Sequence, residues 1–160
     1  MKERKMILNN ELNVTFPETF HVMNEEELKK LHFLAKGDGL VLSDPEQHIR
    51  ISVAWKKIGA FSGLVLTSGD VAKCMRRSIR KAMAAYQFRA EEPVRTELGG
   101  KRAEGLAFEY EAEHVQMTSE SLVVKNRRTL YYFHFYTRTE EQSRNRDIWD
   151  QVLASVQWVG

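Results

Sequence analysis

The sequence has little of what would cross-link a fold covalently or place it in a bilayer. It contains one cysteine, Cys74, among 160 residues, so no disulfide can form within the chain. A chain of this length buries roughly 68–70% of its unfolded surface and folds without a disulfide or a structural metal. No apolar run approaches the length of a membrane span, and the opening MKERKMILNN lacks the apolar stretch of a signal peptide. We therefore expect a single domain, residues 1–160, in the reducing cytoplasm.

Neither sign of charge dominates. The chain has 24 basic and 22 acidic residues and a formal net charge of +2, which is too small to imply a nucleic-acid partner. The charges are nevertheless segregated along the chain. Asp70 is the only acid beside six bases between Asp70 and Arg89, whereas Glu91 to Glu120 holds eight acids and three bases. The distribution of charge is therefore more informative than its sum.

Proline is also scarce, and two of the three prolines mark strand ends or turns. Pro17 interrupts the β-rich segment Leu12–Val22, which predicts a strand near the edge of a sheet because proline lacks a ladder donor. Pro45 suits the second position of a turn that joins Leu40–Ser43 to His48–Trp55 as a hairpin. Between them, Asn24 is a candidate N-cap for a short helix with Leu28, Leu31 and Leu34 at helical spacing, ending at KGDG.

The middle of the chain predicts a long helix. Thr67 and Asp70 have the spacing of a capping box, and apolar residues recur three or four apart up to Tyr86, which favours a helix from about Asp70 to Phe88. The remainder has the pattern of a β-meander followed by a C-terminal helix with Ile148 and Trp149 on its apolar side. The meander strands are PVRTEL, KRAEGLAFEYEAEHV, SESLVVK and TLYYFHFYT, with a turn at Gly99-Gly100 between the first two.

This order of elements predicts an α+β fold with a curved antiparallel sheet of about six strands flanked by helices. Four segments, NVTFPETFHV, LGGKRAEGLAFEY, LYYFHFYT and IWDQVLASVQW, resemble the PsbP-like superfamily. That superfamily includes the photosystem protein PsbP, the Ran-binding factor Mog and small bacterial proteins of unassigned role. The resemblance implies an α/β/α sandwich that works as a noncatalytic binding or adaptor module, with a protein as its partner. It transfers no individual binding residue to this chain.

The two-residue period of strands predicts a polar sheet face that could serve as a binding site. In TLYYFHFYT, Tyr131, Phe133 and Phe135 alternate with Tyr132, His134 and Tyr136. We expect helices to cover the apolar side and the other side to remain open. That side would offer a ligand both apolar area and directional hydrogen bonds, because it carries tyrosines, a histidine, an arginine and a carboxylate. Its predicted members are Arg50, Ser52, Glu109, Tyr132, His134 and Tyr136. The alternative is an ordinary sheet face of cross-strand pairs beneath a helix.

A second candidate surface is the outer side of the predicted long helix. Five bases fall on one side of it at three- and four-residue spacing: Lys73, Arg76, Arg77, Arg80 and Lys81. Such a side could dock an acidic partner, a membrane surface or nucleic acid, although most charged helix faces are simply solvated. Exposed edge strands also leave pairing with a second copy open.

The sequence gives less support to a catalytic function. Cys74 lies beside the apolar stripe of the helix, so we expect a buried structural thiol. The histidines show no metal-ligand spacing, and the glycine-containing stretches lack the phosphate-loop and nucleophile-elbow patterns, so we expect no metal and no cofactor. The prediction is a noncatalytic domain, not an enzyme. A small-molecule-binding or hydrolytic protein that uses the polar sheet face is the alternative.

Overall fold

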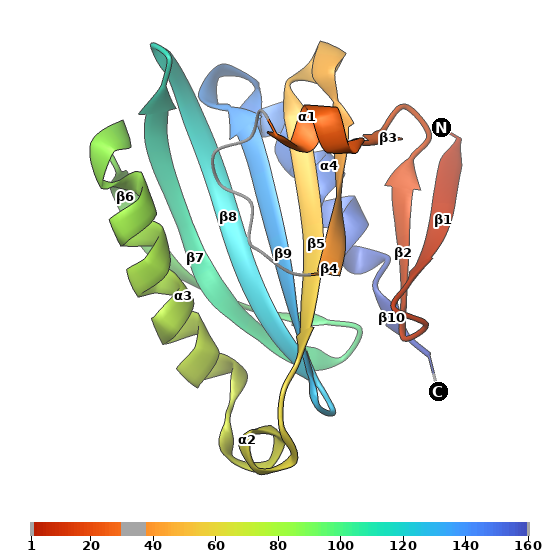
Figure 1. Cartoon of the computed structure of the whole chain (residues 1–160). Coiled ribbons are helices and arrows are strands. Elements are labelled where there is room, and N and C mark those ends of the chain that lie inside the picture. Colours follow the sequence, from red (N-terminus) through yellow and green to blue (C-terminus); the bar gives the residue numbers. More distant parts are fainter. Residues whose placement is uncertain (1, 30–37, 160) are drawn as a thin grey trace.

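The computed structural model describes residues 2–29 and 38–159, which form two antiparallel sheets and several helices (Figure 1). The main sheet has seven strands in the order β3-β4-β5-β9-β8-β7-β6, and a small sheet has three in the order β1-β2-β10. The strands are β1 (Glu3–Leu8), β2 (Leu12–Pro17), β3 (His21–Val22), β4 (Asp38–Asp44), β5 (Ile49–Lys57), β6 (Arg89–Leu98), β7 (Lys101–Ala112), β8 (Val115–Asn126), β9 (Thr129–Arg138) and β10 (Gln157–Trp158). The helices are α1 (Glu25–Lys29), α2 (Ala60–Val65), α3 (Ser68–Met83) and α4 (Gln142–Ala154), with 3-10 turns η1 (Pro45–Gln47), η2 (Ala84–Tyr86) and η3 (Thr139–Glu141).

Helices and a second sheet cover the main sheet on both sides. Helix α3 packs across β7 and β8 on one face (Figure 1). Helix α4 and the small sheet pack on the other face, where side chains of β2, β5, β9 and α4 form the largest apolar cluster. The predicted α+β class with an antiparallel sheet is therefore confirmed. The main sheet has seven strands, close to the expected count of about six, whereas the second sheet of β1, β2 and β10 was not predicted, because β1 is rich in charged residues and β10 is only two residues long.

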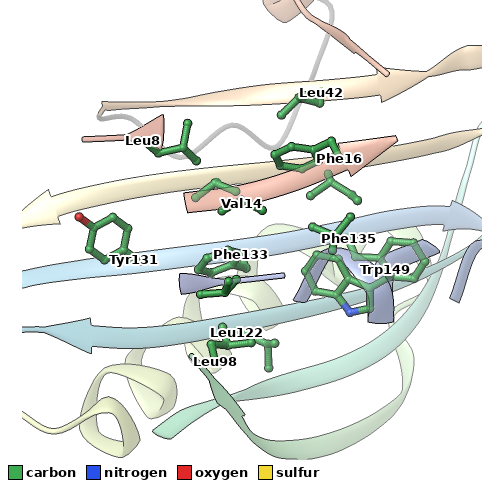
Figure 2. Close-up of a cluster of buried hydrophobic side chains, with 14 of the residues drawn as sticks. Leu8, Val14, Phe16, Leu42, Leu98, Leu122, Tyr131, Phe133, Phe135 and Trp149 are labelled. Carbon is green, nitrogen blue, oxygen red and sulfur yellow. The ribbon is translucent and has the colours of Figure 1, made fainter. Parts of the chain in front are cut away.

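The largest core lies between α4 and the centre of the main sheet. The rings of Phe135 and Trp149 stack with centroids 5.2 Å apart, and Tyr131 and Phe133 continue the same row along β9 (Figure 2). Glu120, only 2% exposed, lies at the edge of this core. Its carboxylate accepts hydrogen bonds from Trp149 Nε1 at 2.5 Å and from the Arg146 guanidinium at 2.8 Å. A buried carboxylate is tolerated here because both of its oxygens have donors.

Several predicted elements form as expected. The hairpin of β4 and β5 pairs Leu40 with Val53, and the turn at Gly99-Gly100 joins β6 to β7. The capping box of α3 is complete: the Thr67 hydroxyl accepts the Asp70 N–H and the Asp70 carboxylate accepts the Thr67 N–H, both at 3.1 Å. The helix is shorter than predicted, because its regular part stops at Met83 and a 3-10 turn follows.

The N-terminal segment shows one error of prediction. Strand β2, which ends at Pro17, is the central strand of the small sheet and not an edge strand. Proline is accommodated there because it is the last residue of the strand. Asn24 caps α1 by accepting the N–H of Glu27 at 2.9 Å. The predicted continuation of this helix through Leu31 and Leu34 lies outside the described residues.

Gly105 lies in β7 at a point where the backbone of β8 leaves no room for a side chain. A Cβ atom on Gly105 would be 1.7 Å from the carbonyl oxygen of Ser121. We expect Gly105→Ala to lower the free energy of unfolding by about 2 kcal/mol or more, because two neighbouring strands must separate. Urea denaturation measures the change. Gly59→Ala is the control, since nothing lies within 4 Å of its added Cβ. Equal losses in the two variants would contradict this account.

Candidate functional site

The register of the central strands brings five of the six predicted face residues together. Arg50 pairs with Tyr136, Ser52 with His134 and Ala54 with Tyr132 across β5 and β9. Paired residues in neighbouring strands point to the same face of a sheet. Arg50, Ser52, Tyr132, His134 and Tyr136 therefore share one face, as the alternation along each strand predicted.

Glu109 lies on the opposite face, so its assignment to this group was wrong. It pairs with Thr118, which pairs with Thr137, which in turn pairs with Ile49 on the apolar side of β5. The residues of β7 that align with His134 and Tyr136 are Leu106 and Phe108 instead. Alternation separates the two sides of one strand, but only the pairing register decides which side of the next strand continues each face.

The shared face is also not open along its whole length. Tyr132 packs against an apolar cluster that includes Val71 and Met75 of α3. Tyr136, which is 9% exposed, packs with Met83 and Leu106. The expectation of a face left free for contact was therefore wrong where α3 crosses it. Because β7 turns its apolar residues to this side, the sheet needs a helix on both faces.

His134 is a half-buried titratable group near the middle of this face. Its Nδ1 lies 2.7 Å from the Ser121 hydroxyl, and its ring is tilted against Tyr136 with centroids 6.3 Å apart. Burial lowers the pKa of His134 to about 4, because the surrounding apolar groups disfavour the charged imidazolium. The side chain is thus a neutral hydrogen-bonding group near neutral pH.

The half-buried Arg50 and the buried Tyr136 lie side by side near one end of β5 and β9. The Arg50 guanidinium carbon lies 4.7 Å from the centre of the Tyr136 ring, a cation–π contact. Burial raises the pKa of Tyr136, and the positive charge of Arg50 opposes that rise. Burial likewise raises the pKa of the neighbouring Tyr110. Both phenols therefore stay protonated near neutral pH.

A cleft of about 260 Å³ opens beside this pair, and we call it the Arg50 cleft. Arg50 and Tyr136 line it together with His48, Arg138 and Met117. The remaining lining residues are Ser43, Pro45 and Ile49. The residues predicted for this face from the sequence did not include His48, Arg138 or Met117. Met117 pairs with Arg138 between β8 and β9, a contact that no local pattern reveals.

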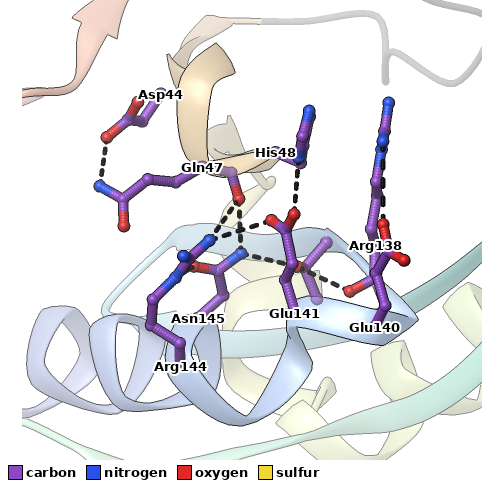
Figure 3. Close-up of polar contacts among 9 residues, drawn as sticks. Asp44, Gln47, His48, Arg138, Glu140, Glu141, Arg144 and Asn145 are labelled. Atoms are coloured by element: carbon purple, nitrogen blue, oxygen red, sulfur yellow. Dashed lines mark hydrogen bonds and ion pairs between the residues drawn. The ribbon is translucent and has the colours of Figure 1, made fainter.

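The wall of the Arg50 cleft is held by a polar network at the start of α4 (Figure 3). Asn145 donates to the Gln47 carbonyl and to the Thr137 hydroxyl, both at 2.8 Å. Glu141 lies 2.8 Å from His48 Nδ1 and 3.0 Å from the Arg144 guanidinium. The hydrogen bond to His48 is the main cause that lowers the pKa of Glu141. The turn η1 is thus fixed to α4, and the cleft has a preformed shape.

The basic side of α3 is exposed as predicted. Lys73, Arg77, Arg80 and Lys81 are exposed and Arg76 is half-buried. The Arg80 guanidinium donates two hydrogen bonds to the Glu91 carboxylate, at 2.8 and 2.5 Å. Cys74 is exposed as well, which corrects the expectation of a buried thiol. Its position on the helix falls on the outer side of the stripe that Val71 and Met75 form, so the sheet does not cover it.

Comparison with known proteins identifies the fold. The solution structure of cyanobacterial PsbP (CyanoP) from Synechocystis sp. PCC 6803 superposes with a TM-score of 0.70 at 15% identity, over 98% of this chain and 92% of that one. The chain has the PsbP-like fold.

Two further solved structures share the PsbP-like fold. LpqN, involved in cell envelope biogenesis of Mycobacterium tuberculosis, matches with a TM-score of 0.62 at 13% identity, over 99% of this chain and 91% of that one. The Ran-binding protein Mog1p of Saccharomyces cerevisiae matches with a TM-score of 0.57 at 10% identity, over 98% and 95%. No family model and no curated protein matches the sequence. At these identities the likeness shows the fold alone.

Residues 2–29 and 38–159 contain neither a cluster of metal-ligating side chains nor a membrane-spanning helix. No group of three or more histidine, cysteine or acidic side chains in these ranges is arranged to hold a metal ion. None of the helices described there is long and apolar enough to cross a membrane.

The lowered pKa of His134 predicts a pH dependence of stability. An unfolded chain takes up a proton on this residue near pH 6.5 and the folded chain only near pH 4, so the free energy of unfolding should fall as the pH drops between these values. We expect a loss on the order of 3 kcal/mol from this residue. Urea denaturation at several pH values should show a shallower dependence in His134→Gln. His114→Gln, in the exposed turn after β7, is the control and should keep the wild-type slope. An unchanged slope in His134→Gln would refute the assignment.

Proposed function

We propose that this chain is a noncatalytic protein-binding module and that an acidic segment of a partner docks at the Arg50 cleft. The observation that carries the proposal is the lining of that cleft. It combines the cation–π pair of Arg50 and Tyr136 with Arg138, His48 and the apolar side chains of Ile49 and Met117. Arginine paired with an aromatic ring is typical of residues that dominate protein interfaces.

The size and rigidity of the cleft favour a side chain of a partner over a free small molecule. Its volume of about 260 Å³ is below the roughly 300–1,000 Å³ of most small-molecule sites. The contacts of Asn145 and Glu141 fix the adjoining turn, so docking would cost little ordering of the site. Mog1p is a Ran-binding protein, and its fold is the one found here, which is consistent with a binding role.

One observation favours the alternative of small-molecule binding. A larger cleft of about 510 Å³ lies at the other end of β5, and we call it the Trp55 cleft. Trp55 and charged groups of both signs line it, including Glu11, Asp38 and Lys57. An aromatic wall together with charges of both signs suits a zwitterionic or polar ligand.

Three sequence-based expectations stay predictions. The basic side of α3 is a second surface on which an acidic partner could dock. The exposed edge of β6 could pair with a second copy, although Pro93 removes one of its donors. A cytoplasmic location is the third.

Site-specific cross-linking tests the proposal. A photoreactive residue at position 45, on the lining of the Arg50 cleft, should capture a defined partner in cells, whereas one at Glu97 on β6 should not. With the captured protein purified, Arg50→Glu should weaken binding about tenfold or more, because an attractive charge becomes repulsive.

Arg77→Glu, at an exposed position of α3, is the matched control and should bind as the wild type does. If Arg77→Glu abolished binding while Arg50→Glu did not, the docking surface would be α3 and the Arg50 cleft would be excluded.

A further inference from the structure

Helix α2 presents a cluster of exposed apolar side chains at one end of the molecule. Phe61 is 78% exposed, Leu64 85% and Val65 54%. Figure 1 shows α2 beyond the ends of β5 and α3, as the outermost element of that end. We call Phe61, Leu64 and Val65 the apolar tip. Exposing three large apolar side chains within six residues costs free energy in water, which indicates that the apolar tip has a binding role.

The apolar tip is held in place through its polar groups and not through its apolar side chains. Lys125 donates to the carbonyls of Gly63 and, at 2.8 Å, of Leu66. The Arg128 carbonyl accepts the Ile58 N–H at 2.8 Å, which fixes the chain just before α2. The Arg128 side chain lies against Gly63, where an added Cβ would be 3.0 Å from Arg128 Cγ. These contacts anchor the inner side of α2 and leave Phe61 and Leu64 pointing outward.

Basic side chains surround the anchored helix, and we call them the basic collar. Lys56 and Lys57 end β5 directly before α2, and Arg127 and Arg128 form the turn between β8 and β9. The pairing of Lys57 with Thr129 brings these two segments side by side. All four collar residues are exposed.

The acidic groups at this end, Glu11, Asp38 and Asp70, are fewer than its exposed bases, which are the four collar residues and Lys73. Glu11 accepts hydrogen bonds from Asn126 and Tyr131. Asp70 is engaged in the capping box of α3, and Asp38 lines the Trp55 cleft. Lys73 adds a further exposed cation on the second turn of α3. The end of the molecule that carries the apolar tip is therefore net positive.

We infer that this end binds the surface of an anionic lipid bilayer, with Phe61, Leu64 and Val65 inserted at the headgroup boundary and the basic collar on the lipid charges. An apolar surface flanked by lysine and arginine is the combination by which peripheral proteins bind anionic membranes. The tip is a projection and not a groove, which suits a deformable lipid interface. The Arg50 cleft lies at the opposite end of β5, so it would face away from the membrane and stay accessible to a protein.

Vesicle co-sedimentation tests this inference. The whole chain should bind phosphatidylcholine vesicles that contain about a quarter phosphatidylserine, and bind pure phosphatidylcholine at least about tenfold more weakly. The double variant Phe61→Ser/Leu64→Ser should lose about tenfold or more of the affinity for the anionic vesicles. Arg127→Gln/Arg128→Gln should lose a similar factor and show a weaker dependence on salt.

Val22→Ser is the matched control, because Val22 is another exposed apolar residue and lies on β3. This variant should bind vesicles as the wild type does. No binding to anionic vesicles at low salt would overturn the inference. So would binding that survives the loss of Phe61 and Leu64, since charge alone would then explain it. Formation of a dimer that the Phe61→Ser/Leu64→Ser variant abolishes, without vesicle binding, would assign the tip to a second copy of the chain.

Discussion

The pairing of β5 with β9 is the constraint on which the rest of the structure depends. It joins Ile49–Lys57 to Thr129–Arg138, two segments far apart in the sequence, into the centre of the main sheet. One face of this pair carries Ile51, Phe133 and Phe135 into the largest core, where Trp149 of α4 stacks on Phe135. The register that buries this face also places Arg50 beside Tyr136 on the other face.

Burial on both sides of the main sheet explains why the functional candidates lie at its ends. Helix α3 covers one face over β7 and β8, and α4 with the small sheet covers the other. Polar groups in the middle are satisfied internally, as His134 is by Ser121. Charged groups reach solvent together where β5 begins and ends, Arg50 with Arg138 at one end and Lys57 with Arg128 at the other.

The fold does not determine what these ends do. CyanoP, LpqN and Mog1p share the fold with this chain at 10–15% identity, and a shared fold does not specify which residues lie on the surface. The Arg50 cleft lies beside the turn η1, and the apolar tip is the short helix α2, so both depend on segments that connect the main elements. Turns vary in length and composition at little cost to the core, so a common scaffold can carry different binding surfaces.

Local patterns determined much of this molecule. Thr67 and Asp70 alone specify the start of α3, and alternation along β9 alone separates Tyr131, Phe133 and Phe135 from Tyr132, His134 and Tyr136. These features depend on residues a few positions apart, whose geometry the backbone fixes. The assignment of Glu109 failed because which face of β7 continues which face of β9 depends on register across β8.

The tertiary structure alone decided what is accessible. Only packing shows that Cys74 is exposed, that α3 covers Tyr132, and that Met117 meets Arg138 at the Arg50 cleft. Exposure is a property of what lies on top of a residue, and the covering element comes from a distant part of the chain. The sequence thus determined the elements and their two-sided character, whereas the tertiary structure decided which sides were covered, because register and packing are set by long-range contacts.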